Sequence, residues 1–204
     1  MSWSGSDLSG AMRAVLPGEL AWYVTGRFYV GSDGAIRDAG YFLHLQGLTG
    51  DLFHGAPGEG TARFTFLSAP FRASHLTNGD LTLAVDTVGE FSLYLNRQPA
   101  ATFDNPQSFA TGEEIATFRR TSIVVGSTVG GGEGGTGLVS LNVFSARLTR
   151  SREFEFERRL YDLGRFLPHG VTQWGTASTQ PISPSPVGFS TVVPFVGSAV
   201  AIGG

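Results

Sequence analysis

Apolar and polar residues alternate along much of the chain from residue 20 onward. In residues 20–30, one set of alternate positions holds Leu20, Trp22, Val24, Gly26, Phe28 and Val30, and the other set holds Tyr23, Thr25, Arg27 and Tyr29. Successive side chains of a β-strand point to opposite faces, so this pattern predicts a half-buried strand. The sequence Gly31-Ser32-Asp33-Gly34 follows, and Asp-Gly suits the positive backbone angles of a tight turn.

Similar patterns continue toward the C-terminus. We expect further strands at residues 41–48, 61–71, 81–85, 91–96, 114–125, 138–148 and 154–166, with turns at Asn78-Gly79, at Val88-Gly89 and at the glycine-rich residues 130–137. For residues 154–166 a short helix is the alternative, because Glu, Arg and Leu are good helix formers. Residues 97–112 are polar and interrupted by proline, which predicts a long loop of a kind that often carries function.

The number of expected strands indicates an all-β fold. We predict a single antiparallel β-barrel of about eight strands, with a sandwich as the alternative. The barrel is favoured because closure removes exposed strand edges. A length of 204 residues fits one such domain. The predicted organisation is an N-terminal extension at residues 1–18, the barrel or sandwich at 19–167, and a proline-rich linker with an apolar arm at 168–204.

The last part of the chain is predicted to be an arm that packs against another surface. Three prolines in residues 180–187 exclude a central strand there. Residues 189–204 carry no charge, and such a segment left exposed would aggregate. It therefore either lies on its own barrel or joins a neighbouring subunit, which predicts a homo-oligomer. The apolar residues expected to make that contact are Phe189, Val192, Val193, Phe195, Val196 and Ile202.

Composition excludes several classes of function. The net charge is −3 and no basic cluster is present, which disfavours binding to nucleic acid or to an anionic membrane surface. No cysteine is present, so disulfides and cysteine-ligated zinc are excluded. All 14 basic residues are arginine, which excludes Schiff-base lysines and P-loop lysines. No apolar stretch is long enough to span a membrane. Residues 1–18 do not resemble a secretory signal; the compartment stays unknown, with the cytoplasm as the default and an exported mature chain left open.

Two sequence features give only weak support for a nucleotide site and a metal site. Residues 130–135 form a G-x-G-x-x-G sequence, but both flanks are expected to be strands, and the dinucleotide fingerprint needs a helix after it. This favours a hairpin loop. A metal site from His44, His54, Asp51 and Glu59 is an alternative to separate histidines, since imidazole and carboxylate suit several divalent metals. None of the four histidines has a metal-motif spacing, so we predict neither a metal nor a cofactor.

Polar side chains that share strand faces with apolar ones are the candidates for ligand binding. If the sheet closes, one face points into a lumen, and polar groups among phenylalanines there would suit a small apolar ligand. The favoured alternative is that these groups face water. The candidate ligand-binding residues are Tyr23, Arg27, His44, Glu114 and Arg119. No catalytic constellation is evident, and whether the chain is an enzyme stays open.

The strand count, glycine turns and phenylalanine-rich strands resemble the small eight-stranded barrels of the allene-oxide-cyclase and dirigent type, and those of lipocalin-like cyclases. This resemblance is architectural and carries no residue across. It implies a barrel isomerase or cyclase as one hypothesis. The first hypothesis from the residues is a module that binds a small apolar molecule, self-assembles through its arm, or does both. A structural subunit of a larger assembly is the third.

Overall fold

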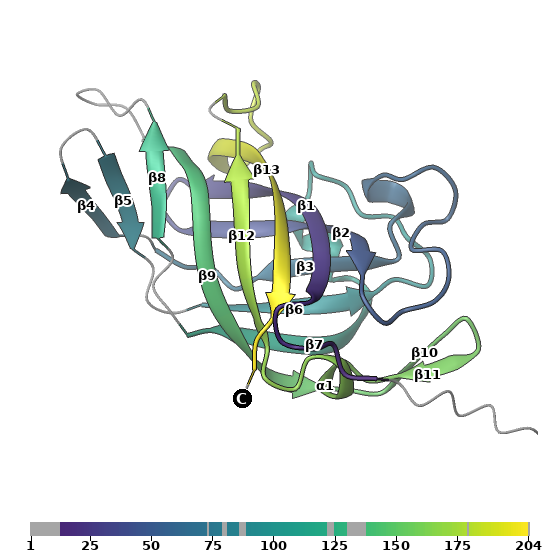
Figure 1. Cartoon of the computed structure of the whole chain (residues 1–204). Coiled ribbons are helices and arrows are strands. Elements are labelled where there is room, and N and C mark those ends of the chain that lie inside the picture. Colours follow the sequence, from purple (N-terminus) through teal and green to yellow (C-terminus); the bar gives the residue numbers. More distant parts are fainter. Residues whose placement is uncertain are drawn as a thin grey trace, which may run out of the picture.

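Eight strands close into an antiparallel barrel (Figure 1), as predicted. The computed structural model describes residues 13–72, 74–78, 81–85, 89–121, 125–129, 138–178 and 180–203. Around the barrel the strands are β12 (Val171–Ala177), β13 (Phe189–Ala201), β1 (Leu20–Gly31), β2 (Ile36–Leu45), β3 (Phe64–Ser68), β6 (Glu90–Leu95), β7 (Glu113–Arg120) and β9 (Leu138–Ser151). Pairing of β12 with β9 completes the circle.

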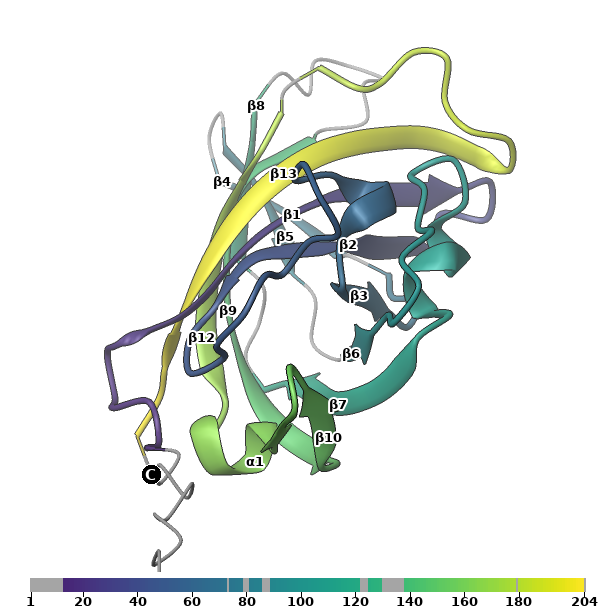
Figure 2. The same ribbon diagram turned by 90° about the vertical axis from the view of Figure 1, so that its right-hand side faces the viewer.

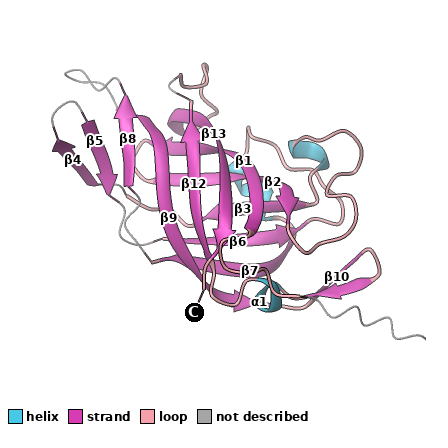
Figure 3. Cartoon of the chain, in the orientation of Figure 1, coloured by secondary structure: helices cyan, strands magenta, loops and turns pink. Residues whose placement is uncertain are grey.

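Three shorter strands extend from the barrel as a flap, visible beside β9 in Figure 3. They are β4 (Ser74–Asn78), β5 (Leu81–Val85) and β8 (Val125–Val129). The long strand β9 makes this arrangement, because its first half pairs with β8 and its second half pairs with β7. The predicted strand over residues 114–125 is thus two strands, β7 and β8. Residues 79, 88 and 130–137 of the predicted turns lie outside the described residues.

Two strands of the barrel, β12 and β13, lie beyond residue 167, where the sequence analysis placed a linker and an arm. Strand β13 is paired along one edge with β1 and along the other with β12. The clustered prolines lie in the connection between β12 and β13. Pro194 lies within β13, and its carbonyl accepts a hydrogen bond from Ser178 N at 2.8 Å, just after the end of β12. Its nitrogen faces that same side, where β12 has already ended, so the missing N–H breaks no pairing.

Inward-facing aromatic rings fill much of the barrel. The alternation predicted for residues 20–30 is confirmed, since Trp22 and Val24 are buried while Tyr23 is 48% exposed. Trp22 meets the rings of Phe42 and Phe118 edge-on, with centroids 5.6 and 5.5 Å away. Such edge-to-face contacts add to the free energy that burial of the rings supplies.

Two glycines on the inner face make room for these rings. Gly26 on β1 pairs directly with Gly40 on β2. A Cβ on Gly26 would lie 2.9 Å from the Phe195 ring, and one on Gly40 would lie 2.8 Å from the Phe66 ring. Only a residue without a side chain allows the rings this close to the backbone.

One end of the barrel is plugged by a helical turn and a small hairpin, seen below the barrel in Figure 2. Helix α1 (Leu163–Phe166) follows the hairpin of β10 (Phe154–Phe156) and β11 (Arg159–Tyr161). The predicted strand over residues 154–166 is therefore this hairpin together with the short helix named as the alternative. Buried side chains of α1 and β10 belong to the main hydrophobic core, which closes this end to solvent.

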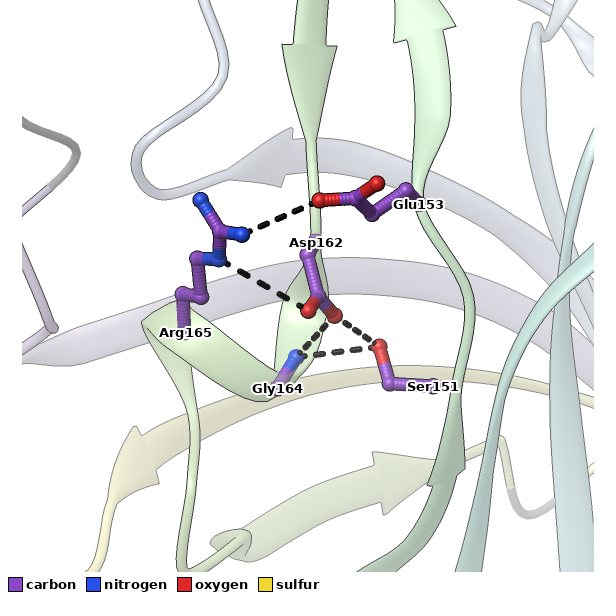
Figure 4. A network of polar contacts seen from close by, with 5 residues as sticks. All are labelled: Ser151, Glu153, Asp162, Gly164 and Arg165. Atoms are coloured by element: carbon purple, nitrogen blue, oxygen red, sulfur yellow. Dashed lines mark hydrogen bonds and ion pairs between the residues drawn. The ribbon is translucent and has the colours of Figure 1, made fainter.

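A polar network fastens α1 to the end of β9 (Figure 4). Asp162 caps the helix, with its Oδ1 accepting from Gly164 N at 2.8 Å. The Ser151 hydroxyl hydrogen-bonds to the same carboxylate and also accepts from Gly164 N at 3.0 Å. Arg165 binds Glu153 at 3.0 Å. These groups satisfy one another at a helix terminus, so their role is to hold the plug in place.

The predicted long loop packs on the outside of the barrel as a second layer. It contains a 3₁₀ turn, η2 (Pro106–Ala110), and a second such turn, η1 (Glu59–Thr61), lies in the connection between β2 and β3. Phe103 and Phe109 of this layer pack against the outward-facing Tyr29 of β1. The outer face of β1 and β2 is therefore partly buried by the chain itself.

We predict that Gly40→Ala destabilises the barrel strongly. The new methyl group would lie 2.1 Å from the Thr25 carbonyl oxygen and 2.5 Å from the Gly26 Cα, and both are backbone atoms of a neighbouring strand. Overpacking of this kind costs about 1–3 kcal/mol or more. Urea denaturation measures it, with Gly60→Ala as the control, because a Cβ there meets nothing closer than 3.8 Å. Equal midpoints for the two variants would contradict the packing of β1 against β2.

Candidate functional site

The barrel interior holds a small cavity beside its buried polar groups. Its volume is about 10 Å³, which is room for about one water molecule. Its walls come from six of the eight barrel strands. The lining residues are Trp22, Val24, Asp38, Phe42, Phe66, Phe91, Phe144 and Gln173. Its walls are apolar and aromatic with a few polar groups, as in small-molecule sites, but its volume is far below that of such a site.

The amide of Gln173 has a fixed orientation in this wall. The Trp22 indole Nε1–H donates to Gln173 Oε1 at 3.1 Å, and both side chains are buried. An indole N–H can only donate, so the amide oxygen must face it and the amide NH₂ must point elsewhere. Gln173 thus brings further hydrogen-bond donors to the cavity wall.

A buried ion pair lies at the end of the barrel away from α1. Arg120 Nη2 donates to Asp38 Oδ1 at 2.9 Å, and the two side chains are only 3% and 7% exposed. Asp38 lies near the start of β2, and Arg120 is the last residue of β7. Burying two charges is so costly that a pair of this kind seldom adds net stability.

Aromatic rings surround the Arg120 guanidinium. Its central carbon lies 4.8 Å from the Phe71 ring centroid, 4.9 Å from that of Phe144 and 5.6 Å from that of Phe91. Two of these rings, Phe91 and Phe144, also line the cavity. Cation–π attraction therefore supports the charge, and the guanidinium lies directly behind the cavity wall.

Several polar atoms at this end have no hydrogen-bond partner among the described residues. They are Arg120 Nε, Arg120 Nη1 and Asn142 Oδ1, all of them buried. Each buried N–H without a partner costs about 1–3 kcal/mol. Nearly all buried polar groups in native proteins are satisfied by protein atoms or by ordered water, so these atoms mark a place where a water molecule or another group can bind.

The sequence carries a signal for these residues that the prediction missed. Arg120 continues the face of Phe118, whereas Arg119 points to the other face. Asp38 alternates with Gly40 and Phe42 in the same way. A charged residue that continues an otherwise apolar strand face is the pattern that marks a buried charge.

The five predicted ligand-binding residues lie on the outward-facing side of their strands, the arrangement that the favoured alternative of water-facing groups expects. Tyr23 and His44 face each other on β1 and β2, with ring centroids 6.2 Å apart. Arg119 pairs with Glu90 at 2.9 Å and Glu114 with Arg150 at 2.6 Å, on neighbouring strands. Whether any of them binds a ligand on the outer surface stays a prediction.

Arg27, the fifth, belongs to the outer layer. Its guanidinium carbon lies 4.2 Å from the centroid of the Phe103 ring. Next to it, the Tyr29 hydroxyl donates to Phe103 O at 2.9 Å. Burial raises the pKa of this phenol well above its ordinary value; the positive Arg27 lowers it, and the negative Glu59 raises it further.

The residues predicted to form an assembly arm are parts of β13 or flank it. Val192, Val193 and Phe195 are buried in the chain's own core, whereas Val196 is 56% exposed. Phe189 and Ile202 are half-buried at the two ends. Assembly by adding this strand to a neighbour would first require it to leave the barrel.

Two further observations concern metal-binding clusters and membrane-spanning helices. Within the described part of the chain, no group of three or more His, Asp or Glu side chains is placed to hold a metal ion. His44 instead hydrogen-bonds to Gln46 at 3.1 Å, and Glu59 accepts from Phe103 N at 3.0 Å. Across the residues that the structure describes, no helix is long and apolar enough to cross a membrane.

Comparison with protein families, curated proteins and solved structures gave no match to this chain.

We predict that Arg120→Met destabilises the protein by about 3–5 kcal/mol, because it leaves the Asp38 carboxylate buried without a partner. The double variant Asp38→Leu/Arg120→Met removes both charges at similar volume. It should recover most of the loss or exceed the wild type, as expected when apolar groups replace a buried ion pair. Urea denaturation of the three proteins measures this. A single variant as stable as the double variant would show that the carboxylate is not buried as described.

We predict that Tyr29→Phe flattens the alkaline loss of stability. The unfolded chain releases the phenolic proton near pH 10, whereas the folded state holds it to higher pH. The contribution of Tyr29 to the free energy of unfolding is therefore fully present below about pH 10 and falls as the pH rises above it. At neutral pH the unfolding free energy of the variant is lower by about 1 kcal/mol, because the hydrogen bond of the Tyr29 hydroxyl is missing. Unfolding free energies from about pH 7 to 11 give both slopes; parallel curves would contradict burial of the phenol.

Proposed function

We propose that this barrel binds a small, mostly apolar molecule in its lumen, at the end that holds Asp38 and Arg120. The observation that carries the proposal is the pair of unpaired N–H groups on a guanidinium that is 3% exposed. A guanidinium cannot lose its charge near neutral pH and can only donate. Leaving its donors unpaired reduces stability, and a ligand that accepts from them would recover this free energy.

The surroundings favour an apolar ligand body. Five of the eight residues that line the cavity are aromatic, and Val24 adds an aliphatic side chain. Rings of this kind bind flat apolar groups through contact area and edge-to-face packing. An eight-stranded barrel is wide enough either to be filled by its own side chains or to hold one small ligand.

Entry of a ligand requires one ring to move, since the cavity is only about 10 Å³. Phe71 is the candidate. It is half-buried beyond the end of β3, and its backbone is held to Ile36 by hydrogen bonds of 2.7 and 2.9 Å. Its side chain can therefore change rotamer without disturbing a barrel strand. Such a rotation would uncover the face of Arg120.

A barrel isomerase or cyclase is the second candidate. The Asp38 carboxylate lines the cavity, and a carboxylate can act as a general base toward a bound substrate. This candidate requires the same ligand site, so binding is the property to establish first.

We predict that Phe71→Ala increases binding of small aromatic molecules. Saturation-transfer NMR with a mixture of neutral one-ring aromatic compounds should give signals with the wild type and stronger ones with Phe71→Ala, because the lumen becomes accessible. Phe53→Ala is the matched control, since Phe53 is also half-buried but packs against Tyr41 in the outer layer. No signal with any of the three proteins, or an equal gain with Phe53→Ala, would contradict a ligand site in the lumen.

A further inference from the structure

The charge balance of the lumen restricts which ligands it accepts, given the ligand site proposed above. Asp38 is the only charged residue among those that line the cavity, and its partner Arg120 neutralises it. The buried pair therefore has no net charge. A bound anion would add one negative charge to an interior lined by rings, with no cation left to balance it. Burying an unbalanced charge is strongly unfavourable.

The unpaired groups on Arg120 specify the kind of polar atom that a ligand must carry. Both Nε and Nη1 are donors without a partner among the described residues, and guanidinium has no acceptor. The Gln173 amide, with its oxygen taken by Trp22, also turns its NH₂ away from the indole. A ligand oxygen that accepts hydrogen bonds suits these donors, and a carbonyl oxygen accepts strongly without carrying a charge.

The available space limits the size of the ligand. The cavity itself is only about 10 Å³ and Phe71 does not line it, but the Phe71 ring lies 4.8 Å from the Arg120 guanidinium, so its rotation would free the volume of one phenyl ring beside Arg120. A molecule with one ring and a short carbonyl-bearing substituent matches that volume. Longer ligands would have to displace the packed rings of Phe91 or Phe144 as well.

We propose that the lumen selects an uncharged molecule of about one aromatic ring that carries a carbonyl oxygen, and that this oxygen accepts hydrogen bonds from Arg120. The buried Asp38–Arg120 pair sets the selectivity: Arg120 supplies the donors, and Asp38 cancels the charge that would otherwise attract carboxylates. Carboxylic acids of the same size are disfavoured, although an arginine alone would favour them.

Three probes of nearly equal size test this inference: acetophenone, which is neutral and has an acceptor; benzoate, which is an anion; and ethylbenzene, which has no acceptor. Dissociation constants are measured by ligand-observed NMR with Phe71→Ala, in which the entry is open, and with the wild type. We expect acetophenone to bind at least about tenfold more tightly than either benzoate or ethylbenzene. In Asp38→Leu/Arg120→Met combined with Phe71→Ala, acetophenone should lose its advantage over ethylbenzene.

Each contrary outcome identifies what is wrong. Benzoate binding as tightly as acetophenone would overturn the selectivity for uncharged ligands and leave the proposed lumen site standing. Equal binding of ethylbenzene and acetophenone would show that Arg120 contributes nothing to recognition, which also overturns the inference alone. Failure of all three probes to bind either protein would overturn the ligand site and this inference together.

A variant that removes only the negative charge separates ligand selectivity from folding. Asp38→Asn keeps the shape of the side chain and leaves Arg120 with an unbalanced positive charge. Benzoate should then bind at least about tenfold more tightly than it does to the parent protein, which narrows or removes the preference for acetophenone. A variant that folds, as judged by its unfolding midpoint, and still disfavours benzoate would overturn the charge-balance argument.

Discussion

When β12 pairs with β9, the eight barrel strands come to share a single interior. Every inward-facing side chain must then fit a space of fixed width, because the number of strands and their tilt set the diameter. This constraint explains why Gly26 and Gly40 lie opposite each other beneath the rings of Phe66 and Phe195. It also places Val193, Phe195 and Ala199 of β13 in the core, although β13 is near the end of the chain.

The same closure gives the interior two different ends. At one end, α1 and the hairpin of β10 and β11 add buried aromatic side chains, and the Asp162 cap network holds them against β9. At the other end the interior contains Asp38 and Arg120, whose guanidinium keeps two donors without a partner among the described residues. The first end is built for stability. The second end holds buried polar groups whose removal from water costs free energy.

Much of the fold could be predicted from the sequence, because the alternation of apolar and polar residues in residues 20–30, and similar alternation in later segments, is a local signal. The long β9 and the division into β7 and β8 were not predictable, since one strand edge serves two partners in succession. The role of residues 189–201 was hidden by proline. A proline usually indicates an edge strand, but the nitrogen of Pro194 faces the point where β12 has ended.

The candidate site was harder to predict than the fold. Arg119 and Arg120 are adjacent, and only the face assignment decides which of them is buried. Arg119 pairs with Glu90 on the surface, whereas Arg120 pairs with Asp38, a residue 82 positions away in sequence. Sequence patterns cannot reveal such a distant partner without the closed sheet. The outward position of Tyr23 follows directly from the alternation of β1, whose inner face holds Trp22 and Val24.

The most direct measurement follows the Arg120 Nε–H group by nitrogen–proton correlation NMR while acetophenone is added to Phe71→Ala. The Arg120 cross-peak is identified by its absence when Arg120→Met is combined with Asp38→Leu. If the lumen binds the ketone through Arg120, this cross-peak moves in a saturable way and benzoate leaves it in place. A cross-peak that stays fixed while ketone-induced shifts occur elsewhere, or while no shift occurs at all, would contradict a ligand site built on this guanidinium.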